Sequence, residues 1–106
     1  MIRSATGSLL TLLAAAVRLV ASVVGGLILL YAVFVFFEAN PANPLVEFTG
    51  GVRRSLGGFT EDLFHPSEPK IAETVNAALA ALVWIVGGNV VSKAVSRLAP
   101  AGKVRA

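Results

Sequence analysis

The chain contains no cysteine, which excludes disulfide bonds, thiolate metal sites and catalysis by a thiol. Charged residues make up only 14% of the 106 residues, against roughly a quarter in an average soluble domain. Hydrophobic residues make up 56%, and a chain of this length is too small to bury that much apolar surface in a core of its own. The composition therefore indicates a single domain in contact with lipid.

Two uncharged, mostly apolar runs dominate the sequence. Residues 19–37, LVASVVGGLILLYAVFVFF, would form a helix of roughly 28 Å, about the thickness of the hydrocarbon core of a bilayer. Residues 74–92, TVNAALAALVWIVGGNVVS, form a second run, which Asn76 and Asn89 weaken. A buried helix of a soluble domain is the alternative for the second run, but a hairpin partner favours a second span. The sequence predicts an all-α membrane protein, an antiparallel hairpin of two transmembrane helices.

The basic residues are distributed unequally about these spans. Three lie in the connecting segment, residues 38–73: Arg53, Arg54 and Lys70. Six lie outside it: Arg3, Arg18, Lys93, Arg97, Lys103 and Arg105. Because Lys and Arg favour the cytoplasmic side, we expect a multi-pass protein of the cell (inner) membrane with both termini cytoplasmic.

Two segments flank the spans on the cytoplasmic side. Residues 1–18 are predicted to form a helical extension, with the guanidinium of Arg18 reaching the headgroups. A signal peptide cleaved near residue 16 is the alternative, but a full span follows at once. Residues 93–106 form a basic tail, for which membrane anchoring needs fewer assumptions than nucleic-acid binding. We therefore expect no nucleic-acid partner.

Small residues occur at similar depth in both spans and predict where the helices meet. Close backbone approach at small residues is the main source of contact between helices in lipid. Asn89 either bonds to Ser22 across the helices, worth roughly 1 kcal/mol, or is an interfacial amide in contact with water. These features serve packing within the hairpin and between copies equally well. The predicted packing residues are Ala21, Ser22, Gly25, Gly26, Gly87, Gly88, Asn89 and Ser92.

The connecting segment begins with two Asn-Pro steps, which end the first helix near residue 38. Asn43 is placed to cap a new helix that has Pro44 at its first position. Apolar residues then recur every three or four positions, which predicts an amphipathic helix over about 44–64, lying flat on the outer leaflet. Its apolar stripe consists of Leu45, Phe48, Val52, Leu56, Phe59 and Leu63.

The same segment contains two adjacent arginines and four glycines. The glycines weaken a helix in water by roughly 1 kcal/mol each, so this helix needs the membrane surface or the spans to form. We expect Arg53 and Arg54 to contact lipid phosphates, or to pair with Glu38 or Glu47.

A resemblance to a known family begins in this segment. The stretch NPANPLVEF, residues 40–48, with the amphipathic run and apolar segment after it, resembles the repeat unit of the YggT family of small bacterial membrane proteins. The resemblance covers roughly residues 30–90. It implies an accessory role linked to membrane-complex maturation, division or osmotic tolerance, and no catalytic activity.

Residues able to do chemistry are few. His65 follows Asp62 by three residues, but a zinc site needs three or four ligands, and no charged residue lies inside either span. We therefore expect no enzyme activity, no metal and no cofactor. The predicted function is an accessory or scaffold subunit that binds the bilayer and other membrane subunits or itself. A holin-type, pore-forming protein is the alternative, although a connector of about thirty structured residues is long for that class.

Overall fold

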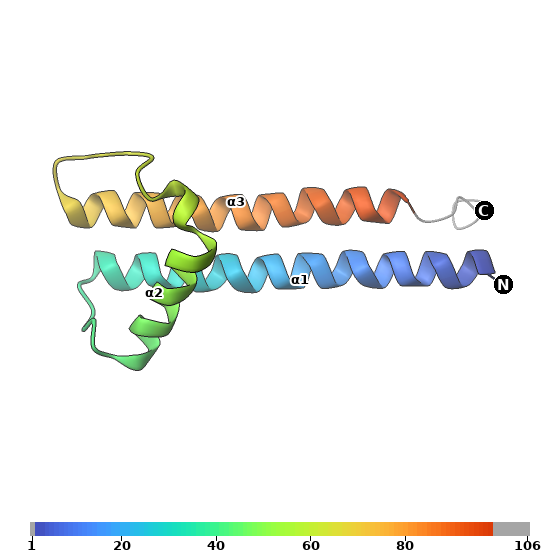
Figure 1. The fold of residues 1–106 in the computed structure, drawn as a ribbon, viewed down its shortest axis with the longest axis horizontal. Coiled ribbons are helices and arrows are strands. Elements are labelled where there is room, and N and C mark those ends of the chain that lie inside the picture. The colour runs from blue at the N-terminus through green and yellow to red at the C-terminus, as the bar shows by residue number, and fades with distance from the viewer. Residues whose placement is uncertain (1, 99–106) are drawn as a thin grey trace.

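The structure is a computed structural model that describes residues 2–98, with side chains from residue 7 onward. It contains the helices α1 (Ile2–Phe36), α2 (Pro44–Leu56) and α3 (Pro69–Arg97), and a short 3₁₀ helix, η1 (Gly58–Thr60). Helices α1 and α3 run antiparallel, side by side, and α2 crosses the pair near the end away from the termini (Figure 1). Lys103, Arg105 and the rest of the predicted tail beyond residue 98 lie outside the described residues, as does the side chain of Arg3.

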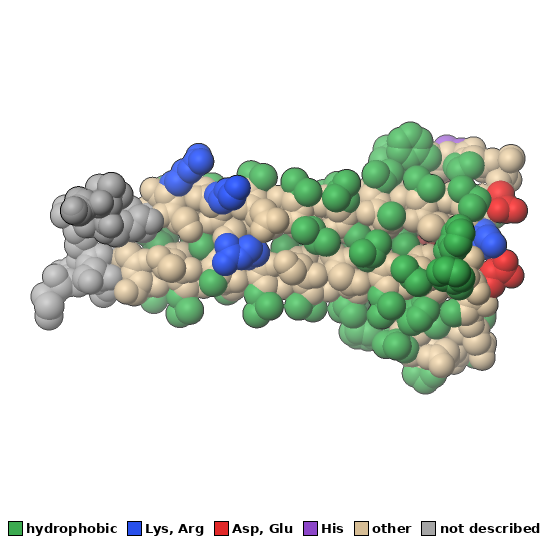
Figure 2. Space-filling model, turned by 180° about the vertical axis from the view of Figure 1, so that it is seen from behind, with side chains coloured by type: hydrophobic (Ala, Val, Ile, Leu, Met, Phe, Trp, Pro, Cys, Tyr) green, Lys and Arg blue, Asp and Glu red, His purple; other side chains and the backbone are tan. Residues whose placement is uncertain are grey.

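Both long helices have the length and apolar character needed to cross a membrane, over Gly7–Phe36 and Pro69–Arg97. Hydrophobic side chains cover the space between a basic group toward the terminal end and acidic groups at the opposite end (Figure 2). Helix α1 is continuous from Ile2, so the predicted N-terminal extension and first span form one helix. The all-helical hairpin predicted from the sequence is confirmed in the described residues.

Helix α1 ends in a motif that favours glycine but contains Glu38. The amide of Ala39 donates to the carbonyl of Phe34 (2.8 Å), and the amide of Glu38 donates to that of Val35 (3.1 Å). This is the Schellman pattern, whose left-handed residue is usually glycine. Glu38 occupies that position with φ of 57°, and a left-handed residue other than glycine costs about 1–2 kcal/mol. Its side chain is used, however, to reach α3.

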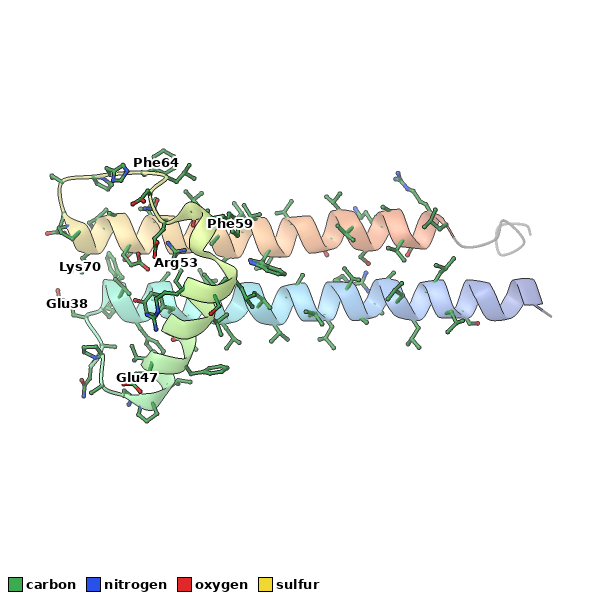
Figure 3. The ribbon with its side chains drawn as sticks, viewed as in Figure 1. Glu38, Glu47, Arg53, Phe59, Phe64 and Lys70 are labelled. Atoms are coloured by element: carbon green, nitrogen blue, oxygen red, sulfur yellow. The ribbon has the colours of Figure 1, made fainter. Side chains whose placement is uncertain are left out.

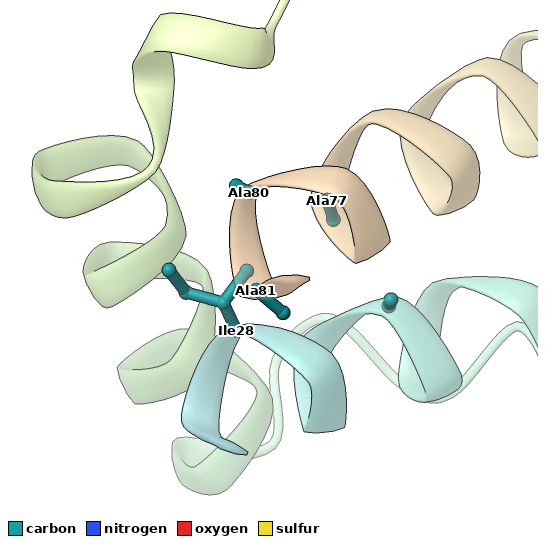
Figure 4. Close-up of a cluster of buried hydrophobic side chains, with 5 residues drawn as sticks. Ile28, Ala77, Ala80 and Ala81 are labelled. Carbon is teal, nitrogen blue, oxygen red and sulfur yellow. The ribbon is translucent and has the colours of Figure 1, made fainter. Parts of the chain in front are cut away.

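The contact between α1 and α3 consists mainly of small side chains. Its core comprises Ile28, Ala32, Ala77, Ala80 and Ala81, all nearly inaccessible to solvent (Figure 4). Short side chains bring the backbones together, which increases van der Waals contact along the pair. At the terminal end, the hydroxyl of Ser92 donates to the carbonyl of Ala14 (2.8 Å) and accepts from Arg18 (3.4 Å).

Half of the predicted packing residues lie in this contact. Ala21, Gly25, Gly88 and Ser92 are buried in it, and a Cβ on Gly25 would lie 2.6 Å from Ile85 Cγ1 and 2.9 Å from the Ala81 carbonyl oxygen. The other four face elsewhere because successive helical residues are rotated by about 100°. Of the two alternatives for these residues, packing between copies stays a prediction, and Ser22 and Asn89 are both exposed; the four are Ser22, Gly26, Gly87 and Asn89.

Helix α2 begins where the sequence predicts and ends earlier. The side chain of Asn43 caps it by accepting a hydrogen bond from Leu45 N (2.9 Å), and Pro44 is its first residue. The helix ends at Leu56, so the helix predicted to continue to residue 64 is wrong over its last two turns. Gly57 follows with φ of −121° and ψ of 11°, outside the helical range, and packs so closely that a Cβ would lie 3.0 Å from Ile28 Cδ1 and 3.1 Å from Ala80 Cβ.

Candidate functional site

The connector helix lies alongside the two long helices instead of beyond their ends. Its last turn reaches Ile28, which precedes the end of α1 by eight residues, or about 12 Å of helix. On α3 the same turn reaches Ala80, eleven residues or about 16 Å from the first residue of that helix. A helix lying beyond both spans would touch only their ends, whereas α2 packs into the side of the pair. Its predicted position on the outer leaflet stays a prediction.

The face of α2 that packs inward is small and polar. The buried residues are Val46, Thr49, Gly50 and Arg53, whereas the predicted apolar stripe points mainly outward. Its exposed members are Leu45, Phe48, Leu56, Phe59 and Leu63. Val52 is half-buried and packs against the core cluster. The helix thus turns most of its large apolar side chains to its surroundings, together with Glu47 and Arg54, and buries Thr49 and Arg53 against the protein.

Arg53 is the centre of the junction between α2 and the helix pair. Only 1% of its surface is exposed, and its Nε lies 3.2 Å from Oε2 of Glu73 on α3. Its Nη1 donates to the carbonyl of Gly57, just past the end of α2, and its Nη2 is buried without a partner. The predicted contact of Arg53 with lipid, or with Glu38 or Glu47, is therefore wrong. Helix periodicity places residue 53 with residues 46, 49 and 50 on the inward face.

Side chains of α3 also hold the break that follows α2. Trp84 Nε1 donates to the carbonyl of Leu56 (2.7 Å), the last residue of the helix. The hydroxyl of Thr60 in η1 donates to the backbone carbonyl of Asn76 (2.6 Å). The first bond satisfies one of the final carbonyls of α2, which have no partner within the helix. The second joins η1 to the backbone of α3, and both bonds link segments more than fifteen residues apart in the sequence.

Asn76 binds the loop after η1 with its whole amide group. Its Nδ2 donates to the carbonyls of Glu61 and Phe64, both at 3.0 Å, and its Oδ1 accepts from the amide of Phe64 at 3.1 Å. The residue is only 2% exposed. Sequence reasoning treated Asn76 as a weak point of the second span and gave no role to Glu73, Thr60 or Trp84. A lone amide in an apolar run was the available signal, since a buried amide requires hydrogen-bond partners.

A second link joins the ends of α1 and α3. Lys70 Nζ lies 2.8 Å from Oε2 of Glu38 and 5.6 Å from the centre of the Phe36 ring (Figure 3). The hydrogen bond from Lys70 lowers the pKa of the Glu38 carboxyl below its ordinary value. Both side chains are accessible, so this pair is screened and weaker than the one at Arg53.

An apolar groove continues below η1 between α1 and α3. It has a volume of about 580 Å³ and is bounded by Phe59, Trp84 and Gly87, among others. The predicted chemical candidates lie elsewhere, since His65 and Asp62 are exposed in the loop. Among the residues that the structure describes, no group of three or more His, Asp or Glu side chains is placed to hold a metal ion.

Comparison with known proteins gives no match. No protein-family model, no curated protein and no solved structure is significantly similar to this chain. Its function has to be argued from the arrangement of its own residues.

Proposed function

We propose that this chain is a non-enzymatic integral membrane protein in which α1 and α3 cross the bilayer and α2 re-enters it from the outer side. The protein acts as an accessory or scaffold subunit of a membrane complex or of a homo-oligomer. The two long apolar helices support this position in the bilayer. Only 28% of the most apolar window of each is buried inside the molecule, whereas a core helix of a soluble protein is mostly buried. The remaining apolar surface needs a solvent such as lipid.

The observation that carries the re-entrant position is the hydrogen bonding at the end of α2. Broken backbone at membrane depth is tolerated only where protein groups satisfy it, because each unsatisfied group in hydrocarbon costs several kcal/mol. The side chains of Trp84, Arg53 and Asn76 bond to the carbonyls exposed by the break. Leu45, Phe48 and Leu56 on the outward face of α2 offer apolar surface to lipid, beside the exposed charges of Glu47 and Arg54.

Charge supports an orientation. Arg18 and Glu38 are twenty residues apart on one chain, which corresponds to about 30 Å and matches the hydrocarbon thickness. The excess of Lys and Arg on the terminal side supports an inner-membrane protein with both termini in the cytoplasm. The bend between α2 and α3 then lies on the outer side.

The accessory role follows from what the buried polar groups do. Arg53 and Asn76 bond to the backbone of the connector and Thr60 of the connector bonds to the backbone of α3, so these groups hold the shape of the junction. Partners are other membrane subunits or a second copy, for which the outward small residues Ser22 and Gly26 offer a surface of close approach. We also propose kinship with the YggT repeat unit, on the basis of residues 40–48.

Single cysteines test the arrangement directly, because the natural chain has none. We expect Ser67→Cys to react with a membrane-impermeant maleimide on intact cells and Ser96→Cys to react only after lysis. Phe59→Cys is exposed in the protein, yet we expect it to stay unreactive in membranes and to react in denaturant. Reaction of Phe59→Cys as fast as Ser67→Cys would show that α2 lies at the surface. Collapse of the membrane potential on expression would support the holin-type alternative instead.

A further inference from the structure

The two adjacent arginines of α2 have opposite surroundings. Arg53 is buried and pairs with Glu73, whereas Arg54 is exposed. Arg54 nevertheless has a defined position beside α1. A Cβ on Gly50 would lie 3.0 Å from Tyr31 Cε1 and 3.3 Å from Arg54 Nη1. The missing side chain of Gly50 therefore allows the Arg54 guanidinium and the Tyr31 ring to lie next to each other.

Charge in this cluster is not balanced. The single carboxylate nearby, that of Glu73, is taken by Arg53, and no carboxylate of the described residues lies within 4.0 Å of Arg54. Glu47 shares the outward side of α2 but lies two turns earlier and forms no ion pair there. Two guanidinium groups and one carboxylate leave one positive charge uncompensated.

The depth of the cluster decides which anion can reach it. Tyr31 precedes Glu38 by seven residues, which places the ring about 10 Å of helix below the outer polar end of the hairpin. An arginine near the end of a membrane-embedded element extends toward the headgroup region and bonds to phosphate, for which its planar fork is well suited. Leu45 and Phe48 in the first half of the same helix are exposed apolar residues that suit acyl chains.

We propose that Arg54 and the Tyr31 hydroxyl form a binding site for the phosphate of an anionic phospholipid of the outer leaflet. The acyl chains lie along the outward apolar face of α2. This site deepens the proposed function, because it requires α2 to lie in the bilayer. Binding fixes α2 against α1 by a lipid on one side, as the pair with Glu73 fixes it by protein on the other.

Native mass spectrometry of the protein extracted in mild detergent and offered mixed phosphatidylglycerol and phosphatidylcholine tests the site. We expect the wild type to retain phosphatidylglycerol preferentially, and Arg54→Gln to bind it roughly tenfold more weakly, the loss of about one charge-assisted hydrogen bond. Tyr31→Phe, which removes only the hydroxyl, should show a smaller loss. Arg97→Gln removes the same charge at the opposite end and should bind as the wild type does. Millimolar inorganic phosphate should not displace the lipid.

Three results would overturn the site: equal retention by Arg54→Gln, equal losses in Arg54→Gln and Arg97→Gln, or displacement by free phosphate. Arg54 is exposed, so its variants should keep the helical circular dichroism and unfolding midpoint of the wild type, and a lost fold cannot explain lost lipid. If Phe59→Cys is protected in membranes while Arg54→Gln keeps its lipid, the lipid site alone is wrong. If Phe59→Cys is freely reactive, the proposed re-entrant position is wrong as well.

Discussion

Gly87 and Gly88 are neighbours in the sequence, but alanine at each position should have opposite effects on the stability of the protein. A Cβ on Gly88 would overlap the Cβ of Ala21, far inside the 3.5–4.0 Å at which carbon atoms normally pack. Because the Ala21 Cβ is bonded directly to the backbone of α1, it has no rotamer by which to move. The two helices would have to separate.

The expected changes in free energy of unfolding at the two positions have opposite signs. Overpacking of this kind costs about 1–3 kcal/mol, which we expect for Gly88→Ala. Gly87 has no atom within 4 Å of its added Cβ and borders the apolar groove. Alanine there should gain up to about 1 kcal/mol from its higher helix propensity. The variants should therefore differ by about 1–4 kcal/mol in free energy of unfolding.

The fluorescence of Trp84, the only tryptophan of the chain, reports unfolding in mild detergent titrated with denaturing detergent. Ala21→Gly in the Gly88→Ala background removes the overlapping carbon and should recover most of the loss, which a double-mutant cycle measures. Equal destabilisation by Gly87→Ala and Gly88→Ala, or no recovery in the double variant, would refute this account of the helix contact.

Three further changes probe the connector. Asn76→Leu makes α3 more apolar, yet it should destabilise the fold by about 1–3 kcal/mol, because three hydrogen bonds are lost. Hydrogen exchange in the loop after η1 should become faster, and unchanged exchange would contradict this expectation. Glu73→Gln leaves Arg53 without its counter-charge and should lower the free energy of unfolding by about 3 kcal/mol or less, since Glu73 is 31% exposed. Thermal unfolding in detergent measures the loss of stability, with Glu47→Gln as the control. Lys70 lowers the pKa of Glu38, so the full stabilisation by this link is present when the pH is above 4.5, the ordinary pKa of the carboxyl. The stabilisation is lost as the pH falls through the lowered pKa. The unfolding midpoint between pH 6 and 3 should show this dependence at low salt, and Glu38→Gln should remove it.

The sequence predicted those features that depend on local rules. Uncharged runs of nineteen residues gave the two long helices, and the Asn-Pro steps placed the end of α1 and the start of α2 within a residue or two. Periodicity also identified α2 as amphipathic. These properties depend on backbone chemistry and on the spacing of residues along a single helix.

Features that depend on the partner of a helix were not predictable in the same way. A helical period does not say which face meets the neighbouring helix, and so Gly25 and Gly26 could not be told apart. Arg53 and Arg54 were equivalent for the same reason, although one is buried and the other exposed. The inward packing of α2 depends on bonds from Asn76 and Trp84, which are far along the chain.

The order in which those bonds become available during synthesis has a consequence for biogenesis. A nascent chain that has reached residue 68 contains all of α1 and α2, but lacks Glu73, Asn76 and Trp84. Each of these follows the group that it holds by twelve to twenty-eight residues. Entry of α2 into the bilayer before they emerge would leave Arg53 and the carbonyl of Leu56 uncompensated in hydrocarbon. We therefore expect α2 to wait at the outer surface until the ribosome has released α3, so that the last helix made inserts the middle one.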